Sequence, residues 1–252
     1  RKYSRTEKLV NELLFYACDG ISVKCNESAE IISTTYRNAN KEEMSVISDG
    51  NYISVYDNNI SRSEARADLS VDDGSFVYLY FGLIREYKGV PELVSTFTNR
   101  APPKSEMWIV GRPRSDEIQE SIEEAITNSD RVRTRYKFIE ASRVQYYMNM
   151  ADVLVLPYRH ILNSGSVHLG LSFGLPIIAP EMGCIPETIP DENDLLYDPN
   201  DSKGLEEALI NAYERSDLKS ISKANYSRAL ELNWEHTAEQ MLTMYEQLIH
   251  LE

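Results

Sequence analysis

The sequence has few or none of the features that mark several specialised classes of protein. Its three cysteines, Cys18, Cys25 and Cys184, show no CxxC spacing, which argues against both a disulfide scaffold and a zinc site. No apolar run approaches the roughly 20 residues that a membrane-spanning helix requires. No signal-peptide pattern follows the first residue, Arg1. These absences together predict a cytoplasmic protein without a transmembrane segment.

Positive charge is also scarce. The chain has 26 Lys and Arg against 40 Asp and Glu, a net charge of −14. An excess of that sign repels phosphate backbones, so we expect no nucleic-acid partner. The 252 residues, 42% of them hydrophobic, are ordinary for a globular protein. At about 150 residues per domain, this length predicts roughly one and a half domains.

Short apolar runs alternate with helical periodicity from residue 76 onward. The runs are brief, bounded by turn residues, and cover 76–81, 107–110, 153–156, 176–178 and 195–197. Apolar runs without polar alternation are typical of strands buried on both faces. The alternation predicts an α/β fold, a Rossmann-like parallel sheet with helices on both faces. Ligands of such sheets bind at the carboxyl ends of the strands.

The chain divides into four expected parts. Residues 1–48 show helix and strand patterns too short for an independent sheet, and we interpret them as the tail of a domain whose beginning is absent. Residues 49–74 lose periodicity and collect polar residues, as an interdomain linker does. Residues 75–230 would form the main domain. Residues 231–252 carry an amphipathic pattern and are predicted to form a carboxyl-terminal helix.

The segment FGLIREYKG, residues 81–89, follows a predicted strand directly. Gly82 would allow close approach of the backbone to a ligand, and Arg85 and Lys88 place two cations in one loop. In an acidic chain this pairing suggests a bound anion. A glycine turn with two solvated surface cations explains the segment equally well.

A second loop follows the strand that ends at Pro157. Asn163, Ser164, Gly165 and Ser166 stand where the next helix should begin. Asn or Ser can cap a helix, and the free N–H groups of a helix N-terminus bind anions. An ordinary capped helix is the commoner explanation of this pattern on its own.

Four segments together resemble a known family. FGLIREYKG, ADVLVLPYR, NSGSVHLGLSFGLPIIAPEMGCIPE and NWEHTAEQMLTMY look like the donor-domain blocks of GT-B glycosyltransferases of the family 4 type, also called group 1 glycosyltransferases. They occur in that family's order and cover the chain from about Asp49 to its end. The resemblance implies a nucleotide-sugar-dependent hexosyltransferase with two facing Rossmann-like domains. The donor binds in the carboxyl-terminal domain, and the final helix crosses back toward the amino-terminal, acceptor domain.

The resemblance also implies roles for individual residues. Arg85, Lys88 and the Asn163–Ser166 turn would bind the donor diphosphate. Further contacts to the donor sugar or its loop would come from Gly82 and Glu187. A first-turn acid favoured by the helix dipole explains Glu187 equally well. Phe138 and Ile139 fall where family members touch the nucleobase through backbone atoms.

The family's co-substrate is a nucleotide-diphosphate sugar of the uridine or guanosine type, and neither a cofactor nor a metal is expected. The acceptor would be a saccharide or a lipid-linked saccharide, which keeps peripheral contact with a membrane open. Nothing in the residues chooses among these donors and acceptors.

The sequence departs from the family at two places. Leu83 stands where the family usually has arginine, so the phosphate role passes to Arg85. Ile161 and Leu169 stand where retaining members carry two glutamates. No catalytic residue can therefore be named, and retention or inversion stays open. The alternatives are a non-catalytic nucleotide-sugar-binding module, or a subunit that needs a partner chain for the acceptor site. An epimerase or phosphorylase of the same fold fits the four segments less well, and activity of this truncated chain alone stays in doubt.

Overall fold

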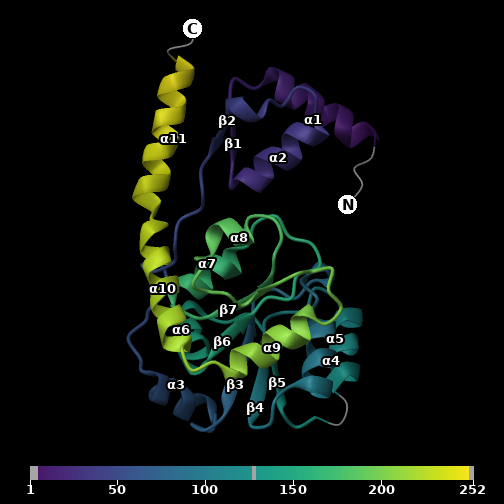
Figure 1. Ribbon diagram of the computed structural model, residues 1–252, viewed down its shortest axis with the longest axis vertical. Coiled ribbons are helices and arrows are strands. Elements are labelled where there is room, and N and C mark those ends of the chain that lie inside the picture. The colour runs from purple at the N-terminus through teal and green to yellow at the C-terminus, as the bar shows by residue number, and fades with distance from the viewer. Residues whose placement is uncertain (1–4, 127–128, 250–252) are drawn as a thin grey trace. The chain divides into compact units, whose positions relative to one another are not determined.

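The computed structural model describes residues 5–126 and 129–249 and divides the chain into two compact units (Figure 1). Unit 1 comprises residues 1–50 and 232–252, and unit 2 comprises residues 51–231. The predicted strand–helix alternation lies in unit 2.

Unit 2 is built on a six-stranded sheet in which every strand pairing is parallel. The strands are β3 (Phe76–Phe81), β4 (Ser105–Val110), β5 (Val132–Arg135), β6 (Val153–Val155), β7 (Ile177–Pro180) and β8 (Leu196–Tyr197). Their order across the sheet is β5-β4-β3-β6-β7-β8. This is the order of a doubly wound Rossmann-like sheet, and it confirms the predicted fold class.

The strand order creates a switch point between β3 and β6. From β3 the chain moves outward to β4 and β5, then returns to β6 and continues in the opposite direction to β7 and β8. The connections after β3 and β6 therefore diverge onto opposite faces of the sheet. A crevice at their carboxyl ends is the usual ligand site of such folds.

The helices of unit 2 cover both faces of this sheet. They are α3 (Arg62–Leu69), α4 (Val90–Arg100), α5 (Asp116–Ile126), α6 (Ala141–Met150), α7 (Gly165–Ser172), α8 (Ile185–Thr188), α9 (Gly204–Glu214) and α10 (Leu218–Glu231). Helices α4, α5 and α9 share one hydrophobic cluster with Tyr78 and Tyr80 of β3. On the other face Tyr147 of α6 packs against Phe81 and Trp108.

Strand β3 shows why the strand sequences carry no polar alternation. Val77, Tyr78, Leu79 and Tyr80 are all fully buried, so residues of both faces contact packed helices. The hydroxyl of Tyr78 donates a hydrogen bond of 2.6 Å to the carbonyl oxygen of Leu209 in α9. The prediction of strands buried on both faces is confirmed here.

Of the segment 49–74, expected to be a linker, residues 51–74 belong to unit 2 and contain helix α3. Ser61 and Glu64 form a capping box at its start. Arg66 is 1% exposed and donates hydrogen bonds to four backbone carbonyls and to Asp152. The segment lacks hydrophobic periodicity because caps and a buried guanidinium hold it in place, and such bonds leave no apolar pattern in a sequence.

Over its described residues, 5–50 and 232–249, unit 1 contains a two-stranded parallel sheet and three α-helices. Its elements are α1 (Arg5–Ala17), β1 (Ile21–Val23), α2 (Asn26–Thr35), the 3-10 helix η1 (Lys41–Glu43), β2 (Met44–Val46) and α11 (Trp234–Ile249). Val23, Ala29, Tyr36, Ala39 and Met44 form its small core. The hydroxyl of Thr237 in α11 donates a hydrogen bond of 3.2 Å to the Ser48 carbonyl. Among the described residues of either unit, no helix is long and apolar enough to cross a membrane.

Candidate functional site

The site begins where β3 and β4 end side by side. Gly82 and Gly111 follow these strands with φ angles of +139° and +148°. A methyl group added at Gly111 would lie 1.8 Å from the carbonyl oxygen of Gly82, so only glycine allows this approach. Beyond them Ile84 forms a parallel bridge to Pro113. The loops after β3 and β4 therefore run together along the carboxyl edge of the sheet.

A third glycine joins the loop after β3 to the loop after β6. Gly89 has a φ angle of +66°, and a methyl group there would lie 2.0 Å from the carbonyl oxygen of Pro157. The N–H of Arg159 donates a hydrogen bond of 2.8 Å to the Tyr87 carbonyl. These contacts hold the loops after β3 and β6 together at the switch point and bring Lys88 beside Tyr158.

Lys88 is held by the hydroxyl and the ring of Tyr158. Its Nζ donates a hydrogen bond of 3.2 Å to the Tyr158 hydroxyl and lies 4.4 Å from the centroid of the same ring. Tyr158 is 2% exposed, and its hydroxyl is also 2.7 Å from Oγ of Ser164. One buried tyrosine therefore joins the predicted cation of the β3 loop to the predicted helix start.

Helix α7 begins at this point. Its N-cap residue, Ser164, makes no side-chain capping hydrogen bond, because its hydroxyl faces Tyr158 instead. A methyl group added at Gly82 would lie 3.2 Å from Oγ of Ser166, so the first turn of α7 touches the end of β3. The helix N-terminus thus contacts Gly82 of the β3 loop and is linked through Tyr158 to Lys88 of the same loop. We call Gly82, Arg85, Lys88, Tyr158 and residues 164–166 the cradle.

The electrostatics of the cradle favour an anion. Burial lowers the pKa of Lys88, and the nearby Arg85 guanidinium lowers it as well, while Tyr87 opposes the shift. Arg85 itself is exposed at the start of the 3-10 helix η2 (Glu86–Lys88). Two cations held close enough to disturb each other gain most from a ligand that carries negative charge. The partial positive charge of the α7 N-terminus adds to the same field.

The structure brings most of the predicted site residues together. Gly82, Lys88, Ser164, Gly165 and Ser166 gather at the cradle, with Arg85 on the same loop. Asn163 precedes them, and its side chain accepts a hydrogen bond of 2.8 Å from the Ser164 N–H.

The other predicted residues are on other segments than the cradle. Phe138 and Ile139 follow β5, the outermost strand on that side. Phe138 is 76% exposed and Ile139 is buried. Glu187 lies exposed in α8, just beyond Cys184, whose N–H donates a hydrogen bond of 2.7 Å to the Leu162 carbonyl.

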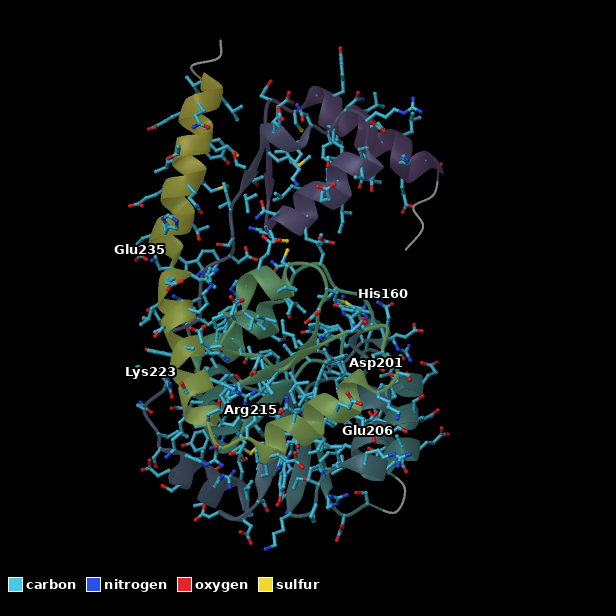
Figure 2. All side chains as sticks on the ribbon, in the orientation of Figure 1. His160, Asp201, Glu206, Arg215, Lys223 and Glu235 are labelled. Carbon is cyan, nitrogen blue, oxygen red and sulfur yellow. The ribbon has the colours of Figure 1, made fainter. Side chains whose placement is uncertain are left out.

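The two positions that carry glutamate in retaining family members are apolar here in structure as well as in sequence. Leu169 is 8% exposed, packed within α7, and Ile161 is half-buried on the loop that precedes this helix. His160, next to Ile161, is exposed on the same loop (Figure 2). The structure therefore places no carboxylate at either position.

Sequence reasoning missed two tyrosines of this region. Tyr158 follows Pro157 at the end of β6, and its position at the carboxyl end of a buried strand was the available signal. Tyr52 comes from the segment expected to be a linker. A methyl group added at Gly165 would lie 3.1 Å from the Tyr52 hydroxyl, so this ring reaches the start of α7. No sequence pattern indicated that contact.

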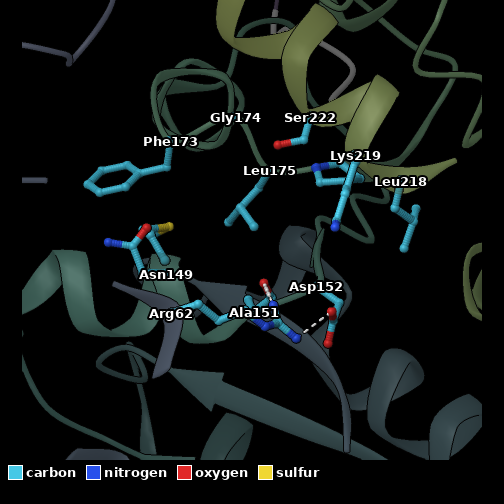
Figure 3. A pocket seen from close by; sticks show the side chains of 12 residues that line it. Arg62, Asn149, Ala151, Asp152, Phe173, Gly174, Leu175, Leu218, Lys219 and Ser222 are labelled. Atoms are coloured by element: carbon cyan, nitrogen blue, oxygen red, sulfur yellow. Dashed lines mark hydrogen bonds and ion pairs between the residues drawn. The ribbon is translucent and has the colours of Figure 1, made fainter. Parts of the chain in front are cut away.

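A pocket of about 430 Å³ lies at the opposite, amino-terminal edge of the sheet (Figure 3). Its lining includes Ala151 and Asp152 before β6, Pro176 before β7, and the side chains of Arg62 and Lys219. Arg62 is already engaged there, since it donates hydrogen bonds to Asp152 and to the Ala151 carbonyl. None of the predicted site residues lines this pocket, so it is separate from the cradle.

Metal-ligating side chains do not gather at any point of the described chain. Over residues 5–126 and 129–249, no group of three or more His, Cys, Asp or Glu side chains is placed to hold a metal ion. The charges available at the cradle are those of Arg85 and Lys88.

A doubly wound sheet with cations and a helix N-terminus at its switch point defines a class of α/β proteins that bind anionic ligands at that crevice. Residues 75–215, more than half of the chain, match the family described as "Glycosyl transferases group 1". The chain therefore belongs to the group 1 glycosyltransferases, and the predicted family is confirmed.

Two curated relatives show the range of this similarity. A "GDP-mannose:glycolipid 4-beta-D-mannosyltransferase" of Xanthomonas campestris pv. campestris is 32% identical over 102 residues, which are 40% of this chain and 29% of the relative. An "Alpha-maltose-1-phosphate synthase" of Mycolicibacterium smegmatis is 27% identical over 195 residues, 71% of this chain and 50% of the relative. The chain thus spans half or less of the length of these relatives.

Solved structures share the fold. Sucrose-phosphate synthase from Thermosynechococcus elongatus superposes with a TM-score of 0.83 at 23% identity, covering 100% of this chain and 63% of that one. Anabaena Alr3699/HepE, solved with UDP and glucose, gives 0.82 at 18% identity and covers 97% and 68%. At these identities the likeness establishes the GT-B fold.

Proposed function

We propose that this chain is the donor-binding half of a glycosyltransferase that moves a hexose from a nucleotide-diphosphate sugar to an acceptor hydroxyl. The observation that carries the proposal is the cradle, where Tyr158 links Lys88 to the N-terminus of α7 and Arg85 lies on the same loop as Lys88, in a chain of net charge −14. Residues 75–230 would be the donor domain and 1–48 part of the acceptor domain. Residues 231–252 would form the helix that returns to the acceptor domain.

The cradle suits the chemistry of the leaving group. As the bond between sugar and phosphate breaks, negative charge develops on the departing diphosphate. Arg85, Lys88 and the N–H groups of Gly165 and Ser166 can neutralise that charge directly. We therefore propose transfer without a metal ion or a separate cofactor.

The comparisons indicate which donors to test first. The Xanthomonas relative is named for GDP-mannose, and one Anabaena HepE structure was solved with UDP-glucose. Gly82 and Glu187 would face the sugar or its loop, and Phe138 and Ile139 would meet the nucleobase through backbone atoms. The acceptor would be a saccharide or a lipid-linked saccharide, as the word glycolipid in the relative's name suggests.

A thermal-shift screen of the full chain against GDP, UDP, ADP and their hexose derivatives tests donor binding. A ligand that binds only the folded state must raise its melting temperature, so at least one nucleoside diphosphate should do so in a concentration-dependent way. Inorganic sulfate at the same ionic strength is the control for nonspecific anion effects. No shift with any nucleotide at millimolar concentration would overturn the proposal.

Ile161 and Leu169 favour a second candidate, a module that binds the nucleotide sugar and leaves catalysis to a partner chain. Both candidates predict donor binding, so turnover separates them. Release of nucleoside diphosphate from the bound donor, in the presence of saccharide acceptors, supports the transferase. Tight donor binding with neither transfer nor hydrolysis supports the module.

A further inference from the structure

Three polar side chains stand in series at the switch point. Lys88 Nζ is 3.2 Å from the Tyr158 hydroxyl, which is 2.7 Å from Oγ of Ser164. Tyr158 is 2% exposed and Ser164 is 4% exposed, so water has little access to the middle of the series. The three residues come from the β3 loop, the end of β6 and the start of α7.

The direction of the first hydrogen bond follows from the chemistry of the Lys88 ammonium group. An ammonium group has three donors and no acceptor, so the Tyr158 oxygen must accept from Lys88. Tyr158 keeps its own proton at neutral pH, because burial raises the pKa of its hydroxyl. The Tyr158 hydroxyl contacts Oγ of Ser164 at 2.7 Å, where either group can donate, and it also hydrogen-bonds the hydroxyl of Ser166. When Tyr158 donates along the contact to Ser164, Ser164 retains its own hydroxyl proton.

The remaining proton of Ser164 has no acceptor among the described residues. Ser164 does not cap α7, and its one recorded hydroxyl contact is with Tyr158. The neighbouring Ser166 hydroxyl also contacts Tyr158 but differs in having a second partner, since it donates a hydrogen bond of 3.4 Å to the Phe81 carbonyl. The free proton therefore lies at the N-terminus of α7, where a ligand oxygen would complete the series.

We propose that Tyr158 is a positioning residue that orients Lys88 and the Ser164 hydroxyl as one directed hydrogen-bond chain toward a diphosphate oxygen of the donor. This inference rests on the proposed function for the identity of the ligand. Tyr158 acts through its two neighbours and also carries the Lys88 ammonium over its ring, at 4.4 Å from the centroid. Tyr158 thereby connects the loop after β3 to the start of α7, so that Lys88 and the Ser164 hydroxyl are both directed to one ligand.

The charged and titratable groups around Lys88 are few. Its own loop contributes Arg85 and Tyr87, which shift the pKa of Lys88 in opposite directions. Tyr158 comes from the end of β6, followed by Arg159, which pairs with Glu92 of α4. Because the Tyr158 oxygen accepts from the ammonium, its removal should lower the pKa of Lys88.

The first experiment needs no ligand. In the full chain with labelled lysine side chains, NMR titration of Lys88 should show a lower pKa in Tyr158→Phe than in the wild type. Tyr78→Phe is the matched control, since it removes another buried hydroxyl with an internal hydrogen bond, to Leu209, and should leave Lys88 unchanged. An unchanged Lys88 titration in Tyr158→Phe would overturn the proposed direction of the chain.

The second experiment measures affinity for GDP and UDP by calorimetry in Tyr158→Phe, Ser164→Ala and the double variant. Each single change should weaken binding about tenfold, and the double variant should be no weaker than either, because the groups act as one unit. Fully additive losses, or unchanged affinity in Tyr158→Phe, would overturn the coupling. Ser164→Ala removes a single oxygen atom and keeps the test valid if Tyr158→Phe folds poorly.

The two experiments separate this inference from the proposed function. If neither nucleotide binds the wild type, the proposed function is wrong. A donor diphosphate is then also excluded as the acceptor of the Ser164 hydrogen bond. If binding depends on Lys88 but ignores the Tyr158 hydroxyl, the proposed function stands and the positioning role is overturned.

Discussion

Lys88 and Tyr158 form the contact that joins the two sides of the sheet's switch point. The ammonium donates to the hydroxyl at 3.2 Å and lies over the same ring. Seventy residues separate them in sequence. Their contact turns two separate sequence motifs into one cationic site, and several consequences of that arrangement can be measured.

Replacement of Lys88 by methionine should weaken nucleoside-diphosphate binding about tenfold to a hundredfold. Charge-assisted hydrogen bonds contribute about 1.5–3 kcal/mol each, and methionine keeps the length of the side chain without its charge. Calorimetry at fixed ionic strength measures the loss. Lys223→Met is the control, since Lys223 is exposed on α10 and also changes the net charge by one (Figure 2). Equal affinity in Lys88→Met and the wild type would contradict the assignment.

As pH rises, donor affinity should begin to fall at a lower pH than it would if Lys88 had the usual lysine pKa. The ammonium form binds the anion, so binding is full below the pKa of Lys88 and is lost as pH rises through it. Burial and Arg85 lower that pKa below 10.5. Calorimetry with a nucleotide sugar from pH 7 upward records the decline. Lys88→Arg should remove this dependence, because a guanidinium stays charged throughout; an unchanged profile in that variant would assign the decline to another group.

The Lys88→Met variant should also show that the buried Lys88 ammonium lowers the free energy of unfolding. Because the pKa of Lys88 is lowered in the folded state, the unfolded chain binds more protons between that pKa and 10.5. The free energy of unfolding therefore rises with pH across that window. Lys88→Met should unfold in denaturant at the same or a higher concentration than the wild type at pH 7 and show a flatter pH dependence. A clear destabilisation would indicate that the ammonium stabilises the fold.

Gly111→Ala should destabilise unit 2 by more than about 2 kcal/mol. The added methyl group would meet the Gly82 carbonyl oxygen at 1.8 Å, at a φ angle of +148° that alanine rarely adopts. Urea unfolding measures the change. Gly74→Ala is the control, because the nearest atom to its added methyl group is an Asp72 carboxylate oxygen at 3.2 Å. Similar midpoints for both variants would show that the two loops can separate freely.

Arg66→Met should cost about 3 kcal/mol or more, whereas Arg62→Met should cost about 1 kcal/mol or less. Both arginines pair with Asp152, but the Arg66 side chain is 1% exposed and the Arg62 side chain 46%. Loss of Arg66 also leaves buried carbonyl groups without their donor. Denaturant unfolding of the two variants makes the comparison, and equal costs would contradict the placement of α3 in unit 2.

The sequence determined the elements and the chemistry of the loops. Continuous apolar runs predicted strands such as β3 and β4. A strand that is buried on both faces has no solvent-exposed position, so its sequence carries no alternating polar residues. Gly82, Arg85, Lys88 and the Asn163–Ser166 turn could be predicted as one site because strand ends are recognisable and parallel strands end at one edge of a sheet.

Tertiary structure decided which loops meet. Strand order is set by the packing of helices on the sheet, so the closeness of β3 to β6, and of Lys88 to Tyr158, has no local signal. Helix α3 was missed because Arg66 is buried by hydrogen bonds, which produce no hydrophobic period. Local residue patterns report what each segment can do alone, and the cradle exists because separate segments fold against one another.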